Sequence, residues 1–195
     1  SLTLTSQNGR NATTIQLQTG PTYTGSLNIA GSDVTVHGFT IVGRDGAAPS
    51  TLAATNIYLV AGLHDVSITD NRIRVGQIDT NSNGDDGMGI LTTYAVADHL
   101  HQLTVTGNIF EPLNATGNRA FFINPGTDGF TFSGNTITGA FTRSAITQAR
   151  NGLVEGNTLT GTGSSATLGS WGYPDAAEFG NTVFRANTIS GTSAG

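Results

Sequence analysis

The chain has 195 residues, which is enough for one domain with a continuous buried core. Its eight basic residues are all Arg, are scattered, and are outnumbered by 13 acidic residues, which excludes the basic patch of a nucleic-acid-binding protein. Cysteine is absent and no run of about 18 apolar residues occurs, so disulfides, thiolate metal sites and membrane insertion are not expected.

The first five residues alternate polar and apolar side chains and predict a strand. No signal peptide precedes them, which indicates a mature protein or a segment excised from a larger surface protein. Neither terminus carries an amphipathic helix that would cap a stack of strands. We therefore expect a single domain over residues 1–195 that continues into other domains, stacks end to end with copies of itself, or ends in short irregular tails.

One short pattern recurs along the chain: two apolar residues at alternate positions, then two further residues, an Asn, and an apolar residue two positions later. Its copies centre on Phe39, which replaces the Asn, and on Asn71, Asn108, Asn135, Asn157 and Asn187, at intervals of 22 to 37 residues. Apolar residues at period two give a strand with one buried face. Asn suits the bend because it tolerates left-handed backbone, and stacked Asn amides can bond along the stack.

A further strand is expected before most copies, at residues 57–59, 90–92, 121–123, 145–146 and 167–168. No segment keeps a 3.6-residue period, which excludes a helical fold, and the intervals are shorter than propeller blades. The sequence therefore predicts an all-β fold, a single-stranded parallel β-helix of about six coils. The largest loop insertions fall at residues 76–87, 95–102 and 162–180, and solenoid insertions often lie on the binding face.

The segments Gly134-Asn135-Thr136-Ile137 and Gly156-Asn157-Thr158-Leu159 resemble the parallel β-helix repeats of the pectin-lyase-like superfamily, and the resemblance covers most of the chain. It implies a right-handed solenoid that is secreted or displayed on the cell surface and faces polysaccharide. That superfamily includes pectate lyases, polygalacturonases, alginate epimerases, phage tailspikes and noncatalytic surface proteins, so the resemblance selects no single activity.

The insertion at residues 79–87 reads Asp-Thr-Asn-Ser-Asn-Gly-Asp-Asp-Gly, and oxygen ligands at alternate positions followed by Gly are typical of a Ca²⁺ loop. An EF-hand is excluded because its twelfth position is Ile90 rather than Glu, and because strands flank the loop. A looser Ca²⁺ loop and a plain polar turn both stay open, and no cofactor is required. The ligands in the Ca²⁺ interpretation are Asp79, Asn81, Asn83, Asp85 and Asp86.

Asp85 and Asp86 also resemble the paired aspartates of polygalacturonase-type glycosidases, in which two carboxylates divide acid and base roles. Neighbouring residues point to opposite sides of a strand, so this pair needs a third carboxylate from another coil. The Asn-Thr-Asp and Arg-Ile-Lys motifs of that family have no counterpart in this sequence.

A lyase or epimerase site is the second catalytic hypothesis, since lyases of this fold often combine Ca²⁺ with Arg or Lys. Arg119 and Arg143 begin successive copies of the same predicted strand and are expected to lie close together. They are the candidate catalytic cations, while Asp98, His99 and His101 lie in an adjacent insertion. The plainer interpretation is that these Arg residues cap the solenoid edge and that the His residues are solvated.

Aromatic residues offer a binding site for sugars instead. Tyr58, Leu91 and Phe122 occupy matching positions in successive strands and predict an outward column. Trp171 and Tyr173 lie in the last insertion. All the aromatic residues named here are candidates for stacking on substrate, and each can equally cover a flank of the core.

Thr-x-Thr ranks on a flat face are typical of ice-binding solenoids. Thr35, Thr69, Thr104 and Thr106 are not expected to hold one register because the coil length varies, which argues against antifreeze function.

Together these features predict an extracellular β-helix module with a structural or adhesive role, binding polysaccharide or copies of itself. The alternative is a polysaccharide-modifying enzyme, either a lyase, an epimerase or a glycoside hydrolase, that uses Asp85, Asp86, Arg119 and Arg143.

Overall fold

The computed structural model describes residues 1–16, 27–44, 55–76, 88–114, 117–161, 168–170, 177 and 179–191. Within these ranges the side chains of residues 117–118, 142–146 and 170 are not described. The described residues contain no helix, and every strand pairing among them is parallel. The expected all-β fold built from parallel strands is therefore confirmed.

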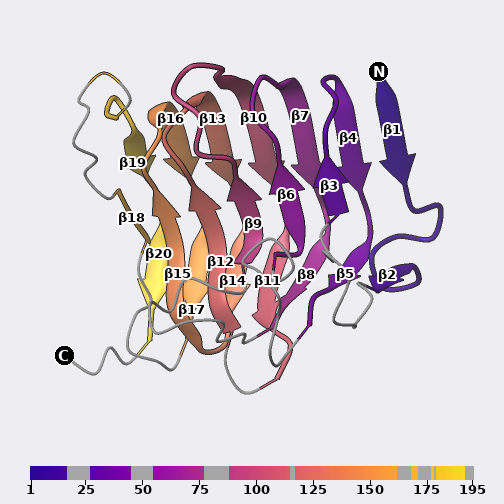
Figure 1. Ribbon diagram of the computed structural model, residues 1–195. Helices are drawn as coiled ribbons and strands as arrows, with labels where there is room; N and C mark the ends of the chain where they lie inside the picture. Colours follow the sequence, from indigo (N-terminus) through magenta and orange to yellow (C-terminus); the bar gives the residue numbers. More distant parts are fainter. Residues whose placement is uncertain are drawn as a thin grey trace.

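Three parallel sheets run the length of the molecule, and each takes every third strand of the chain, as in a β-solenoid (Figure 1). Sheet A contains β1 (Leu2–Thr5), β4 (Val34–His37), β7 (His64–Thr69), β10 (Leu100–Thr106), β13 (Thr127–Ser133), β16 (Arg150–Glu155) and β19 (Val183–Arg185). Sheet B contains β2 (Thr14–Gln16), β5 (Thr40–Val42), β8 (Arg72–Val75), β11 (Ile109–Pro112), β14 (Thr136–Thr138), β17 (Thr158–Thr160) and β20 (Thr188–Ser190). Sheet C contains β3 (Leu27–Ile29), β6 (Ile57–Leu59), β9 (Met88–Thr92), β12 (Gly117–Ile123), β15 (Phe141–Thr147) and β18 (Leu168–Ser170).

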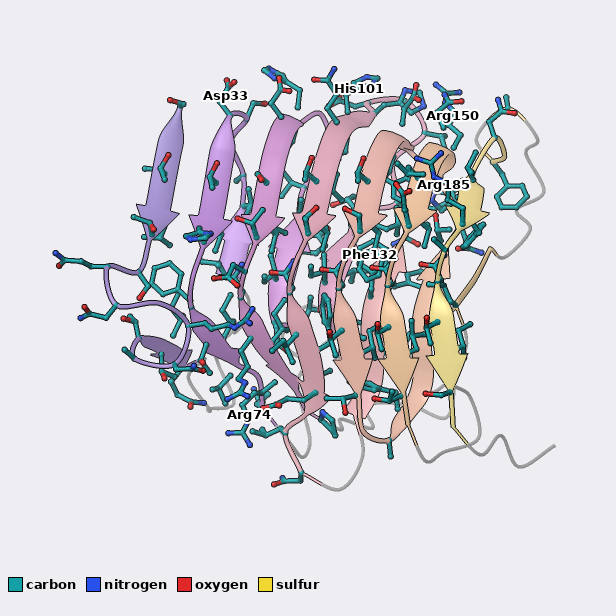
Figure 2. All side chains as sticks on the ribbon, turned by 180° about the vertical axis from the view of Figure 1, so that it is seen from behind. Asp33, Arg74, His101, Phe132, Arg150 and Arg185 are labelled. Atoms are coloured by element: carbon teal, nitrogen blue, oxygen red, sulfur yellow. The ribbon has the colours of Figure 1, made fainter. Side chains whose placement is uncertain are left out.

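The core lies between the three sheets and is built from the alternate apolar positions of the repeat. In sheet A one buried rank consists of Val36, Ile68, Val105, Phe132 and Val154. Phe132 is fully buried and stacks on Phe121 of sheet C with ring centroids 4.2 Å apart, and Phe110 of sheet B is 6.0 Å away (Figure 2). Such aromatic contacts add to the free energy gained from burial and join the three sheets at the centre.

The predicted Asn ladder exists at the bend between sheets A and B. From Asn108 onward, each Asn Oδ1 accepts hydrogen bonds from the backbone N–H and the side-chain Nδ2 of the preceding ladder Asn, as Asn157 does from Asn135 (2.9 and 3.1 Å). Each Nδ2 also donates to a main-chain carbonyl, as Asn135 does to Val105 (2.9 Å). The ladder runs through Asn71, Asn108, Asn135, Asn157 and Asn187, and it begins at the backbone N–H of Phe39.

The expectation that these Asn residues adopt the left-handed conformation was wrong. The positive φ falls on the residue before each of them, as at Asp70 (55°), Gly107 (68°) and Gly134 (59°). This placement lets the Asn side chain turn inward to reach the neighbouring strand, while Gly or another residue makes the bend.

One apparent gap in the repeat has a packing reason. Gly152 stands at a core position of sheet A, where the preceding copies carry an apolar side chain, and it pairs with Phe130. A Cβ at Gly152 would lie 2.1 Å from Cε1 of the Phe130 ring. The large ring on one strand therefore fills the space of two side chains.

Candidate functional site

The outer face of sheet A carries an open hollow of about 510 Å³, a volume in the range of small-ligand sites. Its lining consists of Gln102, Leu103, Thr104, Gly129, Phe130, Thr131, Asn151, Gly152, Leu153 and Asn181. None of these side chains ionises, so the lining offers amide and hydroxyl groups together with a limited apolar surface. Such a lining suits an uncharged ligand that is rich in hydroxyl groups.

The amides of the hollow are positioned by the bend at which the chain enters sheet A. A residue with positive φ occurs there in successive coils, and the hollow contains Gln102 (57°), Gly129 (74°), Asn151 (55°) and Asn181 (52°). Asn tolerates this conformation better than most residues, and Gly accepts it without strain. The Nδ2 of Asn181 donates to Oδ1 of Asn151 at 3.3 Å, so two of the amides are linked along the stack.

A charged network fixes one edge of the hollow. Asp128 accepts hydrogen bonds from Asn151 Nδ2 at 2.7 Å and from Arg150 Nη2 at 3.0 Å, and His101 Nδ1 lies 4.0 Å from its Oδ2. Burial alone raises the pKa of Asp128, but the hydrogen bonds from Asn151 and Arg150 and the charges of Arg150 and His101 outweigh it. The pKa therefore lies below its ordinary value of 3.8. Ionised Asp128 holds the Asn151 amide in place, and His101 and Arg150 lie along the same edge of the molecule (Figure 2).

At the other end of this edge, Asp33, His64 and Asp65 bring ligand-type atoms within 4.8 Å of one another. All three side chains are exposed, and His64 Nδ1 already contacts Asp65 Oδ2 at 3.0 Å. The geometry is that of an exposed His64–Asp65 contact beside a second carboxylate, and it carries no assignment of a metal site.

The sequence-predicted residues Arg119, Phe122 and Tyr58 lie together on the outer side of sheet C. The Arg119 guanidinium is 4.8 Å from the centroid of the Phe122 ring, and both side chains are buried, with exposed fractions of 2% and 8%. Tyr58 packs in the same cluster with Leu91, and its hydroxyl lies 2.5 Å from Thr93 Oγ1. The predicted column of Tyr58, Leu91 and Phe122 is therefore confirmed in register, with Leu91 and Phe122 buried.

The remaining predicted residues are placed only in part. Arg143 pairs with Arg119 in the backbone register, as expected for successive strands, but its side chain lies outside the described residues. The proposed metal ligands and the aromatic pair of the last insertion also lie outside them: Asp79, Asn81, Asn83, Asp85, Asp86, Trp171 and Tyr173.

Sequence reasoning missed the amides of the hollow, although a signal exists. Gln102, Asn151 and Asn181 each lie six residues before a ladder Asn, which is the length of one strand of sheet A with its bends. Any polar residue at that offset is brought to the same edge of the sheet.

The expectation that the threonine residues do not keep a common register was also wrong. Thr35 pairs through Ser67 with Thr104, and Thr69 pairs with Thr106, so these residues fall into two regular ranks. The coil length varies because insertions lie outside sheet A, and the register within sheet A is kept.

No protein-family model, curated protein or solved structure matches this chain. Among the described residues, no helix is long and apolar enough to cross a membrane.

Proposed function

We propose that this chain is an extracellular structural or adhesive module that binds an uncharged polysaccharide at the outer face of sheet A. The observation that carries the proposal is the hollow, whose lining combines amides, hydroxyls and Leu153 and contains no ionisable side chain. Polysaccharide hydroxyls pair with amide and hydroxyl groups, and the apolar faces of sugar rings pack on aliphatic side chains.

The rigidity of the site supports the same proposal. The Asn151 amide is fixed by Asp128, the Asn181 amide bonds to Asn151, and parallel ladders hold the strands beneath them. A rigid site loses little conformational entropy when it binds. This suits a polysaccharide that is bound through many weak contacts. The fold proposed for this role is the right-handed parallel β-helix of about six coils, and the proposed location is secreted or on the cell surface.

The experiment is a binding screen by isothermal titration calorimetry with uncharged soluble glycans such as cellohexaose and xylohexaose, and with polygalacturonate and alginate oligomers. We expect binding of an uncharged glycan. The double variant Asn151→Gly/Asn181→Gly removes both amides while Gly accepts the positive φ, as Gly129 does at the same bend. Its affinity should fall by about tenfold, since each lost hydrogen bond contributes about 0.5–1.5 kcal/mol.

The matched control is Asp33→Gly/Asp65→Gly, which changes the same bend in two coils outside the hollow. It should leave the affinity unchanged. Equal losses in both double variants would indicate a general effect on the bend, and binding only to the acidic oligomers would refute a neutral site.

A polysaccharide-modifying activity is the alternative, and the juxtaposition of Arg119 with Phe122 and with the Arg143 backbone favours it. In this alternative Asp85 and Asp86 supply the acid and base, and the loop at residues 79–86 supplies a Ca²⁺ site. The same glycans, incubated with Ca²⁺ or with a chelator, would then yield unsaturated ends detected by ultraviolet absorbance or new reducing ends.

Self-assembly is the other form of the structural role. Apolar side chains at core positions of the first and last described strands are exposed, as at Leu2 (63%), Leu4 (40%), Phe184 (38%) and Ile189 (51%). Another set of coils would cover them, and stacking of copies would give filaments that lengthen with concentration in electron micrographs.

A further inference from the structure

Two columns of outward side chains, almost all hydroxyls, run along the outer face of sheet A. The first column consists of Thr3, Thr35, Ser67, Thr104 and Thr131. The second consists of Thr5, His37, Thr69, Thr106 and Ser133. The Glu155–Arg185 ion pair continues the second column in β16 and β19, while Leu153 and Val183 continue the first.

The two columns differ in what their hydroxyls do. In the second column four of the five side chains bond in pairs, Thr106 with Ser133 (3.1 Å) and His37 with Thr69 (3.1 Å). Among the described residues, the first column makes no side-chain hydrogen bond, and its members are exposed or half-buried. We call this first column the free hydroxyl column. It is available for bonds to a partner.

The spacing of the free hydroxyl column is set by the backbone. Neighbouring strands of a sheet lie about 4.8 Å apart, and alternate residues of a strand about 6.7 Å apart. The strands of sheet A lie side by side along the whole molecule (Figure 2). The outer face therefore presents a rigid, periodic and uncharged array of hydroxyl groups that extends beyond the hollow.

We propose that this array binds the surface of an ordered solid polysaccharide, made of packed, extended and uncharged chains. This inference rests on the proposed function, because the hollow lies on the same face and would bind a single polysaccharide chain. Each hydroxyl contributes little alone, and an open face does not enclose a ligand. Many weak bonds give a high affinity only when the partner is itself rigid and periodic. A flexible chain loses conformational entropy on binding, and this loss offsets the free energy of the bonds.

The partner is uncharged because the free hydroxyl column carries no charge, while the ionised groups of sheet A lie at its edge or in its last strands. In an extended β-1,4-linked chain equivalent hydroxyls recur at every second sugar, a length close to twice the strand spacing of about 4.8 Å, so that every second coil can meet equivalent hydroxyls of one chain. Adjacent chains in a solid continue the match across the face.

The experiment is a pull-down with microcrystalline cellulose and crystalline chitin, compared with calorimetric binding of cellohexaose and chitohexaose. The variant Thr3→Val/Thr35→Val removes two free hydroxyls outside the hollow and keeps the side-chain shape. The matched control is Thr158→Val/Thr188→Val, which removes the hydroxyls of two threonines that are neighbours in the register of sheet B. As in the test variant, both lie on the outer side of the sheet, and one is half-buried and one exposed. Circular dichroism melts confirm that both variants fold.

We expect one of the two solids to bind the protein, and Thr3→Val/Thr35→Val to weaken that binding by about tenfold. The control should bind as the original chain does, and the affinity for soluble hexaoses should stay unchanged in both variants. Equal binding of the solid by the two variants overturns the inference. Binding of a hexaose without binding of either solid also overturns it, but leaves the proposed function intact. Failure with solids and hexaoses alike refutes both. Shaping of ice crystals without binding to either solid would assign the array to ice and overturn the inference as well.

Discussion

Replacing Asn135 by Ala tests whether the Asn ladder holds the coils together. Asn135 is buried at 1% exposure, accepts a hydrogen bond from the backbone N–H of Asn108 at 2.9 Å, and donates to the carbonyl of Val105 at 2.9 Å. The variant leaves that N–H and that carbonyl without a partner. A buried group without a partner costs about 1–3 kcal/mol, so the loss should be about 2–6 kcal/mol. That is a large share of the 5–15 kcal/mol of a typical domain.

The assay is urea unfolding followed by circular dichroism, together with hydrogen exchange of the Asn108 amide, which should become faster in the variant. Asn187→Ala is the control, because Asn187 makes the same contacts to Asn157 and Val154 but is half-buried. Water can replace its bonds, and the cost should stay near 1 kcal/mol. Equal losses at the two positions, or an unchanged exchange rate at Asn108, would refute the reasoning.

Two further predictions concern packing and pH. Gly152→Val should destabilise the fold by about 1–3 kcal/mol because its Cβ meets the Phe130 ring, and adding Phe130→Leu should restore most of the loss in the same urea assay. Asp128 has a lowered pKa in the folded state, so it stabilises the fold above its ordinary value of 3.8, and this contribution is lost as the pH falls through the folded pKa. Asp128→Asn should therefore lower stability near pH 6, and the difference from the original chain should shrink as the pH falls below 3.8; a loss that does not change with pH would contradict the assigned role.

The repeat predicted the scaffold because the same physical requirement returns in every coil. Alternating apolar residues such as Val66 and Ile68 must face the core, and a buried Asn at the bend must have its amide bonded. Most strands, the third sheet and the ladder could be located from these two requirements, but β2 and β3 of the first coil were not predicted. The φ values could not, since the pattern does not say whether Asn71 or the preceding Asp70 makes the bend.

The free hydroxyl column could not be found by counting residues between coils. Insertions of different length separate the strands of sheet B from those of sheet C, so that equivalent positions drift in the sequence. Within sheet A the distance from the bend to the ladder is constant at six residues, as from Gln102 to Asn108 and from Asn151 to Asn157. Register measured from the ladder, rather than from one copy to the next, would have aligned Thr35 with Thr104.

The difference between the sheets decides where a ligand is to be sought. The sequence directs attention to sheet C, because the aromatic column lies there and the charged insertion directly precedes β9 in the sequence, yet Leu91, Phe122 and Arg119 on that sheet are buried. On sheet A the outward side chains Thr35 and Thr104 stay accessible. The ladder and the apolar ranks stabilise each coil from inside, and among the described residues the side chains of the free hydroxyl column bond to no other side chain, so their hydroxyls add little to the fold. A polar residue kept there in register across successive strands is therefore better explained by a partner outside the molecule than by the packing within it.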